Sequence, residues 1–261
     1  MPPGDRGTIP KYLAAAMVDV PSHDGWLDER EAARLGAMVF TKRRAEARLG
    51  RWTAKRALAA ALRLDDDPSV LRRLSVVNAT DGAPEAFFDG RAVPVSVSMT
   101  DRADWAVCTV IGGDRPIGCD LELVEPRSDA FVADYLTPSE QDLIAAEPDQ
   151  RDLLANLIWS AKESALKLLR TGLRRDTRSV EVGLTPHNRA GDDWTGLYVD
   201  TAEGFTFTGA WRRHGAFVLT YVSATITVWP VPLLDPCPLI TATPSHSWMD
   251  RPRQPPTTTR E

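Results

Sequence analysis

The sequence predicts an α+β protein built from two similar halves. Segments rich in Ala, Leu, Arg and Glu, which favour helix, precede short runs of β-branched residues bounded by turn signals. This order occurs once before residue 116 and again after it, although no clear sequence repeat accompanies it. Hydrophobic residues make up 43% and charged residues 26% of the 261 residues, so the chain can bury a sizeable core.

The first half is expected to cover residues 11–115, after a flexible N-terminus at residues 1–10. The segment DDDP at residues 65–68 ends the second helix, and Asp-Gly and Gly-Gly pairs separate the later strands. The expected elements, in order, are a strand, two helices and three strands, at residues 13–20, 28–40, 43–62, 74–80, 93–99 and 105–111.

The second half is expected to cover residues 116–228 and to begin with a strand, PIGCDLELV. Thr137, Pro138 and Glu140 have the spacing of an N-cap, a first-turn proline and a capping box. These three residues therefore predict the start of a helix.

A long amphipathic helix is expected over residues 151–173, closed by Gly172. Four strands follow it, near residues 178–184, 195–200, 204–211 and 216–227. The Pro- and Thr-rich stretch at 229–261 shows no usable periodicity, so it is expected to be a disordered tail.

Composition and charge exclude several classes of function. The net charge of −5 argues against a general nucleic-acid-binding protein, and the apolar run at residues 12–18 is too short to span a bilayer. The three cysteines are far apart and lack metal-ligand spacing, which is typical of a reducing compartment. We therefore expect a soluble cytoplasmic protein with no membrane partner.

Three carboxylates have the spacing of a metal site. Asp120 and Glu122 lie two apart on the predicted strand, so they project from one face. Trp159, Glu163 and Lys167 lie four apart on the long helix and form one stripe. A hard cation such as Mg²⁺ could join all three carboxylates and hold a substrate phosphate. The alternative is a solvated strand face and a surface Glu–Lys pair.

A basic strip lies in the first half of the otherwise acidic chain. Eight Lys or Arg residues and one acid fall between residues 42 and 63. Arg44, Arg48, Arg51 and Lys55 are spaced to share one helical face. This strip could bind a compact polyanion such as a nucleotide diphosphate, or it could be a solvated face.

The chain resembles the Sfp-type 4′-phosphopantetheinyl transferases over roughly residues 28–225. The family signature is a Gly-x-Asp-x-Glu strand followed some forty residues later by Trp-x-x-Lys-Glu-x-x-x-Lys. PIGCDLELV and WSAKESALK fill every position, and LGRWTAKRAL at residues 49–58 resembles a third family segment. The residues that match the double signature are Gly118, Asp120, Glu122, Trp159, Lys162, Glu163 and Lys167.

The resemblance implies a fold and a reaction. The fold would be a pseudo-dimer of two α+β halves with the active site in the cleft between them. The reaction would move the phosphopantetheine arm of coenzyme A onto a serine of an apo acyl or peptidyl carrier protein and release 3′,5′-ADP. Asp120, Glu122 and Glu163 would hold Mg²⁺, Glu163 would take the serine proton, and Lys167 would offset charge on the leaving group.

The resemblance also implies a set of residues that contact coenzyme A. These are basic side chains in both halves: Arg30, Arg44, Arg51, Lys55, Arg102, Lys162 and Lys167. The family's Ser-x-Ser-His-Ser segment is replaced here by SVSMTDRADWAV, which puts Met99 or Asp101 at the histidine position. Arg102 could then take over the missing phosphate contact.

Two other functions remain open from the sequence. A non-catalytic homologue that binds coenzyme A or a carrier protein would explain the missing histidine. A Mg²⁺-dependent nuclease is less well supported, because such sites usually place Glu and Lys two apart on a strand. The family analogy suggests a monomer.

Overall fold

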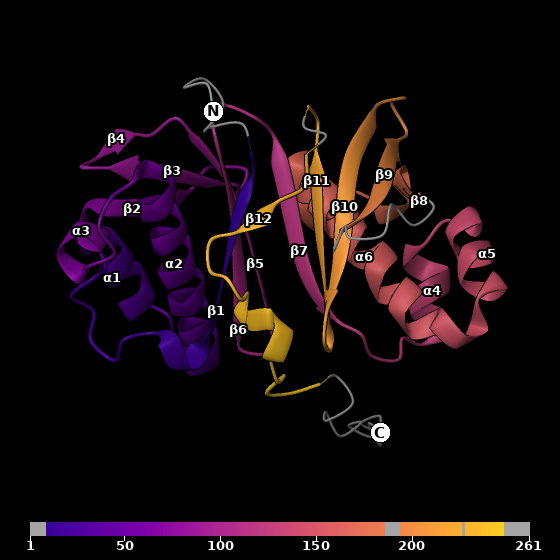
Figure 1. Ribbon diagram of the computed structural model, residues 1–261, viewed down its shortest axis with the longest axis horizontal. Helices are drawn as coiled ribbons and strands as arrows, with labels where there is room; N and C mark the ends of the chain where they lie inside the picture. Colours follow the sequence, from indigo (N-terminus) through magenta and orange to yellow (C-terminus); the bar gives the residue numbers. More distant parts are fainter. Residues whose placement is uncertain (1–8, 186–193, 226–227, 248–261) are drawn as a thin grey trace, which may run out of the picture.

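The computed structural model describes residues 9–185, 194–225 and 228–247, and these form a mixed α+β fold (Figure 1). Elements of the first half lie on one side of the molecule and elements of the second half on the other. The expected α+β class is therefore confirmed.

The first half contains a four-stranded sheet, a small three-stranded sheet and three helices. The large sheet has the strand order β12-β1-β6-β5, and the small sheet has the order β2-β3-β4. The helices are α1 (Glu29–Gly36), α2 (Thr41–Leu62) and α3 (Pro68–Arg73). The strands are β1 (Lys11–Ala16), β2 (Leu74–Asn78), β3 (Pro84–Phe88), β4 (Arg91–Ala92), β5 (Val95–Arg102), β6 (Trp105–Gly112) and the late strand β12 (Val231–Pro232).

The second half is one antiparallel sheet with a long helix on it. The strand order is β7-β11-β10-β9-β8, and α6 packs on this sheet through Leu157, Ile158 and Ala161. The helices are α4 (Asp129–Tyr135), α5 (Pro138–Ala146) and α6 (Arg151–Leu168). The strands are β7 (Ile117–Leu123), β8 (Val180–Leu184), β9 (Thr195–Thr201), β10 (Thr206–His214) and β11 (Phe217–Ser223).

Hydroxyl groups join the two large sheets where β5 faces β7. Ser98 Oγ accepts a hydrogen bond from the backbone N–H of Cys119 at 2.9 Å, and Thr100 Oγ1 accepts one from Leu121 at 3.2 Å. Behind β7, the backbone of Gly118 lies against α6, where an added Cβ would come within 1.8 Å of a backbone oxygen. Glycine at 118 therefore lets the strand approach the helix that carries the other signature residues.

Each half contains a buried Lys–Glu pair built in the same way. In the first half, Glu31 completes the capping box of α1, accepts the Val76 N–H at 3.0 Å and pairs with Lys55 of α2. In the second half, Glu140 completes the capping box of α5, accepts the Val182 N–H at 2.7 Å and pairs with Lys162 of α6 at 2.8 Å. The two lysines close the matching tetrapeptides WTAK (52–55) and WSAK (159–162), a correspondence that the sequence analysis missed.

The expectation of a disordered tail is wrong for residues 229–247. β12 runs parallel to β1, and Leu233 N–H donates to the carbonyl of Tyr12 at 2.8 Å. Cys237 and Leu239 are then buried against both halves, so apolar residues among the prolines anchor this segment. Residues 248–261 lie outside the described residues.

Two expected helices end earlier than predicted. The helix expected at 28–40 ends at Gly36, and the long helix ends at Leu168, before a separate 3₁₀ turn at Gly172–Arg174. The short helices α3 and α4 and the hairpin of β3 and β4 were not expected. Such short elements carry too few residues to show a hydrophobic period.

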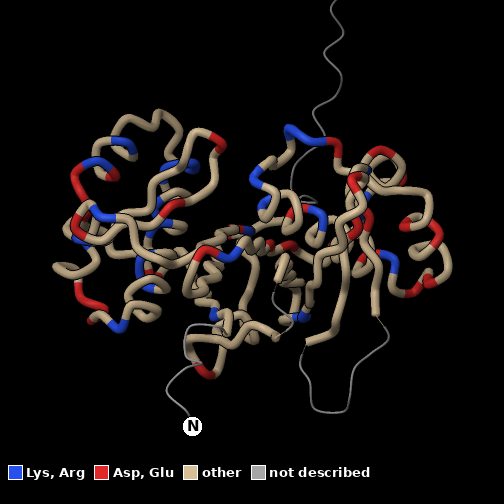
Figure 2. Tube along the Cα trace, turned by 90° about the horizontal axis from the view of Figure 1, so that it is seen from above, with Lys and Arg blue, Asp and Glu red and all other residues tan. Residues whose placement is uncertain are grey.

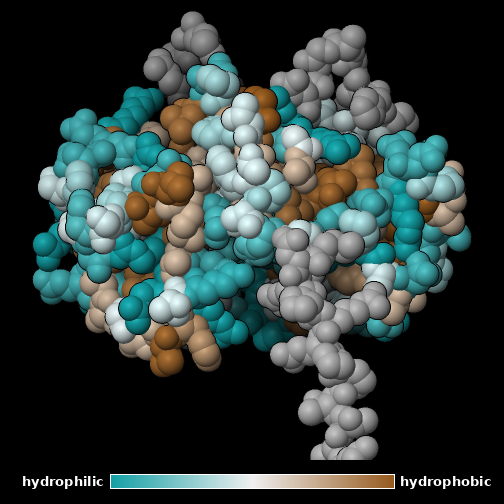
Figure 3. All heavy atoms as spheres, turned by 90° about the horizontal axis from the view of Figure 1, so that it is seen from below, coloured by the Kyte–Doolittle hydropathy of each residue, from teal (hydrophilic) through white to brown (hydrophobic). Residues whose placement is uncertain are grey.

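In the described part of the chain, no helix is long and apolar enough to cross a membrane. Hydrophilic residues cover most of both flanks of the face seen in Figure 3.

Candidate active site

The carboxylate of Asp120 lies at the centre of the site, on β7. Its Oδ1 accepts hydrogen bonds from Lys167 Nζ at 2.7 Å and Thr100 Oγ1 at 2.9 Å. Its Oδ2 is buried and has no hydrogen-bond partner among the described residues. A buried carboxylate oxygen without a partner is costly, so this atom is a good candidate ligand for a cation.

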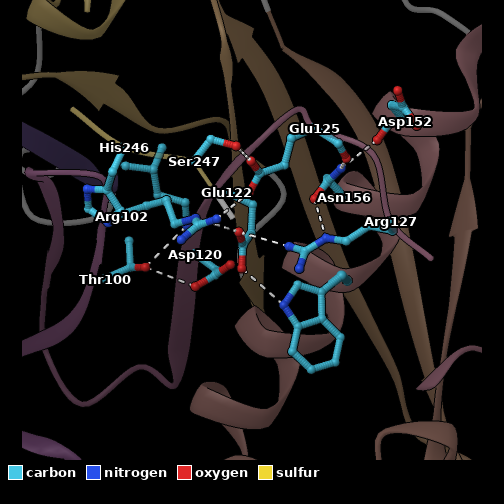
Figure 4. A network of polar contacts seen from close by, with 12 residues as sticks. Thr100, Arg102, Asp120, Glu122, Glu125, Arg127, Asp152, Asn156, His246 and Ser247 are labelled. Atoms are coloured by element: carbon cyan, nitrogen blue, oxygen red, sulfur yellow. Dashed lines mark hydrogen bonds and ion pairs between the residues drawn. The ribbon is translucent and has the colours of Figure 1, made fainter. Parts of the chain in front are cut away.

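Glu122 lies on the same face of β7, between two arginines and an indole (Figure 4). Its Oε1 accepts from Trp159 Nε1 at 3.1 Å, and its Oε2 pairs with Arg127 and Arg102, each at 3.1 Å. Burial and then the charge of Asp120 raise the pKa of Glu122 to about 7, although both arginines lower it.

Glu163 reaches the same site from α6 and is half-buried. No hydrogen bond or ion pair within the described chain reaches its carboxylate, and burial together with the charge of Asp120 raises its pKa to about 7. Lys167, one turn further along, donates to Asp120 and to the Cys119 carbonyl at 3.0 Å. Burial opposes the charged form of Lys167, but Asp120, Cys119 and Glu163 together favour it and raise the lysine pKa.

The donor set fits a hard cation. Within the residues that the structure describes, no three His, Cys, Asp or Glu side chains are grouped as metal ligands. The Asp120 Oδ2 atom and the Glu163 carboxylate are nevertheless both without hydrogen-bond donors, and oxygen is the ligand that Mg²⁺ prefers. Glu122 could join them only by releasing Arg102 or Arg127. Burial, and then the charge of Asp120, raises the pKa of both Glu122 and Glu163, as expected of buried carboxylates that lie close together.

A cleft of about 750 Å³ opens beside Lys167 and is lined by both halves. The first half contributes the β2–β3 hairpin and the start of β5, and the second contributes the start of β7 and the end of α6. Basic side chains line it from both halves: Arg51, Arg115, Lys167, Arg170 and Arg174. Its volume and charge suit an elongated anionic ligand.

Of the basic residues expected to contact coenzyme A, Arg51 and Lys167 line this cleft. Arg51 also donates to Asn78 Oδ1 at 2.7 Å. Arg102 instead faces Glu122 and Glu125. The structure therefore brings the signature residues of β7 and α6 together. Of the basic strip at residues 42–63, which lies wholly within the described residues, Arg51 alone lines the cleft beside them.

Four expected coenzyme A contacts lie elsewhere. Lys55 and Lys162 are fully buried: Lys55 is held by a glutamate and one backbone carbonyl, and Lys162 by a glutamate and two backbone carbonyls. Arg44 donates to the carbonyl of Met38, and Arg30 is exposed on α1. None of these four lines the cleft.

Both candidates for the position of the missing histidine, Met99 and Asp101, lie on β5. Met99 lines the cleft and packs toward α2, where a Cβ added at Gly50 would lie 3.6 Å from its terminal methyl. Asp101 is exposed and lines a separate cavity of about 190 Å³ with Lys42 and His246. Met99 therefore faces the cleft, and Asp101 does not line it.

The polar network continues beyond the expected residues to the C-terminal segment. Arg102 pairs with Glu125, whose other oxygen accepts from Ser247 Oγ (Figure 4). Arg127 donates to Asn156 Oδ1 at 2.7 Å. The charged run after Glu122 could have indicated Glu125 and Arg127, whereas no sequence signal points to Ser247.

Comparisons with known proteins match part of the chain. The family model described as the 4′-phosphopantetheinyl transferase superfamily matches residues 116–220. A 4′-phosphopantetheinyl transferase of Bacillus subtilis is 36% identical over 88 residues, 33% of this chain and 38% of the relative. The 4′-phosphopantetheinyl transferase psf-1 of Bacillus pumilus is 27% identical over 94 residues, 36% of this chain and 40% of the relative. The aligned segments thus span about two fifths of these relatives' own length.

Proposed function

Because residues 116–220 match the family model described as the 4′-phosphopantetheinyl transferase superfamily, we propose that the chain transfers 4′-phosphopantetheine from coenzyme A to a serine of an apo acyl or peptidyl carrier protein. The observation that supports this most directly is the juxtaposition of Asp120, Glu163 and Lys167 at the edge of an anion-compatible cleft. The reaction is expected to occur in the cytoplasm, with a monomer as the active unit.

In the proposed reaction, the serine hydroxyl attacks the phosphorus that carries the pantetheine arm. A new oxygen–phosphorus bond forms, and the bond to 3′,5′-ADP breaks with its electron pair on the departing phosphate. Glu163 accepts the serine proton, a role that suits a carboxylate with no other partner within the described chain and a pKa near neutrality. Lys167, held by Asp120, offsets charge on the leaving group.

Magnesium is the proposed cofactor. Asp120 and Glu163 would hold it, joined by Glu122 once an arginine is released. The ion would neutralise charge on the pyrophosphate of coenzyme A.

The proposal includes a pseudo-dimeric architecture. The two Lys–Glu pairs support it, because each joins a long helix to a capping box and to a backbone N–H of a following strand. The proposal keeps the expected division at residue 116: the carboxylates that would hold the metal lie in the second half, whereas both halves line the cleft.

Mass spectrometry of an apo carrier protein incubated with the chain, coenzyme A and Mg²⁺ tests the proposal. A mass gain of one phosphopantetheine group, abolished by EDTA, is the expected result. No gain with acyl, peptidyl and aryl carriers would refute the transferase.

The second candidate is a non-catalytic protein that binds coenzyme A or a carrier. The apolar Met99 in the cleft favours it, because a thioether cannot donate a hydrogen bond to phosphate. Coenzyme A binding by calorimetry without any transfer would support this alternative.

A further inference from the structure

Two arginines that the sequence analysis did not select line the cleft beside Lys167. Arg170 lies three residues beyond Lys167, just after α6, and Arg174 ends the following 3₁₀ turn. Arg170 has a φ of +58°, in the left-handed region that glycine usually occupies at a helix end. Arginine at this position carries a backbone cost that glycine would avoid.

Both arginines reach across the cleft to the turn between β2 and β3. Arg170 Nε and Nη2 donate to the two carboxylate oxygens of Asp81 at 2.6 and 3.2 Å, and Nη2 also donates to Glu85 at 3.2 Å. Arg174 Nη2 donates to the backbone carbonyl of Asp81 at 2.7 Å. Acidic and basic residues accordingly lie side by side in the strip where the halves meet (Figure 2).

The turn that carries Asp81 is well defined. The backbone N–H of Ala79 donates to Ala83 at 2.8 Å, and Gly82 supplies the positive φ of +91° that closes the turn. Arg51 holds the base of the same hairpin through Asn78. One arginine of the first half and two of the second therefore position this hairpin beside the cleft.

A competing anion can displace the contacts of Arg170 with Asp81 and Glu85 at little cost in stability. The side chains of Arg170 and Glu85 are each 47% exposed and that of Asp81 is 36% exposed, and ion pairs at such exposure contribute little to stability. A phosphate group carries more charge than a carboxylate and accepts the same forked pair of N–H groups from arginine.

We propose that Arg170 and Arg174 bind a phosphate group at the nucleotide end of the co-substrate, and that Asp81 occupies Arg170 when the nucleotide is absent. The inference rests on the proposed function, because it takes coenzyme A as the ligand of the cleft. Asp81 then acts as an internal competitor that the phosphate displaces. If the contact between Arg170 and Asp81 only held the two halves together, replacing either residue would leave the affinity for the nucleotide unchanged.

Calorimetric titration with 3′,5′-ADP tests this, using the whole chain and three variants. Arg170→Gln should weaken binding about tenfold, the loss expected for one charge-assisted contact. Asp81→Asn should strengthen binding several-fold, because the competing charge is removed. Glu203→Gln is the control, since it breaks the partly exposed pair with Arg175 (2.6 Å) outside the cleft and should leave the affinity unchanged.

If Arg170→Gln and Asp81→Asn both bind 3′,5′-ADP within twofold of the wild-type affinity, the inference is wrong. Carrier modification by the wild type would in that case still support the proposed function. Absence of 3′,5′-ADP and coenzyme A binding by the wild type would overturn both. Arg174→Gln should also lower the affinity for 3′,5′-ADP, independently of Arg170→Gln. Thermal unfolding of each variant should match the wild type within the small effect expected of an exposed ion pair.

Discussion

Lys162 offers a sharp test of how the motif helix is built. The family resemblance implies a contact with coenzyme A, whereas the structure buries Lys162 completely against Glu140. Its Nζ also donates to the carbonyls of Thr177, at 3.0 Å, and Val180. Burial lowers the pKa of Lys162, and Glu140 opposes this by favouring the charged form.

Replacing Lys162 with Met should destabilise the fold strongly. The substitution leaves the Glu140 carboxylate buried with only the N–H groups of Thr137 and Val182 as donors, both at 2.7 Å, and strips two carbonyls of their partner. Removing one member of a buried ion pair typically costs about 3–5 kcal/mol. Urea unfolding followed by circular dichroism measures this loss as a lower midpoint at unchanged slope.

Two variants accompany this experiment. The double substitution Lys162→Met with Glu140→Gln should recover most of the loss, since it removes both charges together. Glu203→Gln, at an exposed ion pair, should cost at most about 1 kcal/mol. A Lys162→Met protein as stable as wild type but unable to bind 3′,5′-ADP would refute this reasoning and return Lys162 to the ligand site.

Three further predictions concern the carboxylates and the C-terminal segment. Glu163→Gln should reduce carrier modification roughly 100- to 10,000-fold while leaving 3′,5′-ADP affinity within a few-fold, and full activity would exclude Glu163 as the base. Burial raises the pKa of Glu122 and Glu163 from 4.5 to about 7, so the native state binds more protons than the unfolded chain in this window. Without metal, the unfolding temperature should therefore fall as pH rises from 4.5 to about 7, less steeply in Glu163→Gln, and a flat profile would contradict the shifts. Leu239→Ala should cost about 2–5 kcal/mol in urea unfolding, against little for the 48%-exposed Ile240→Ala, and equal costs would show that the segment is not packed as described.

The signature residues were predictable because their spacing has a local cause. Two-residue spacing on a strand and four-residue spacing on a helix each fix a shared face, so Asp120 and Glu163 could be selected without coordinates. The capping box at Thr137 is confirmed for the same reason, since all of its contacts lie within three residues.

The spacing of the basic strip could not predict which of its residues line the cleft and which are buried. Arg51 and Lys55 lie on one face of α2, yet Arg51 lines the cleft and Lys55 is fully buried. Glu31 reaches both side chains from another helix: it lies 3.9 Å from Arg51 and pairs with Lys55, whose burial it makes tolerable. A periodic pattern identifies a face of a helix, but the partner that neutralises a charge on that face comes from the tertiary fold.

The two matching tetrapeptides account for a division of roles between the halves. After the shared Trp-x-Ala-Lys, the second half continues with Glu163, whereas the first half has Arg56 at the same offset, paired with Asp66 at 2.7 Å. Both helices thus keep the buried lysine, which holds each helix to its capping box, but only α6 presents a carboxylate at this offset. The carboxylates of the proposed cation site therefore come from the second half, while the first half contributes Arg51 and the β2–β3 hairpin to the lining of the cleft.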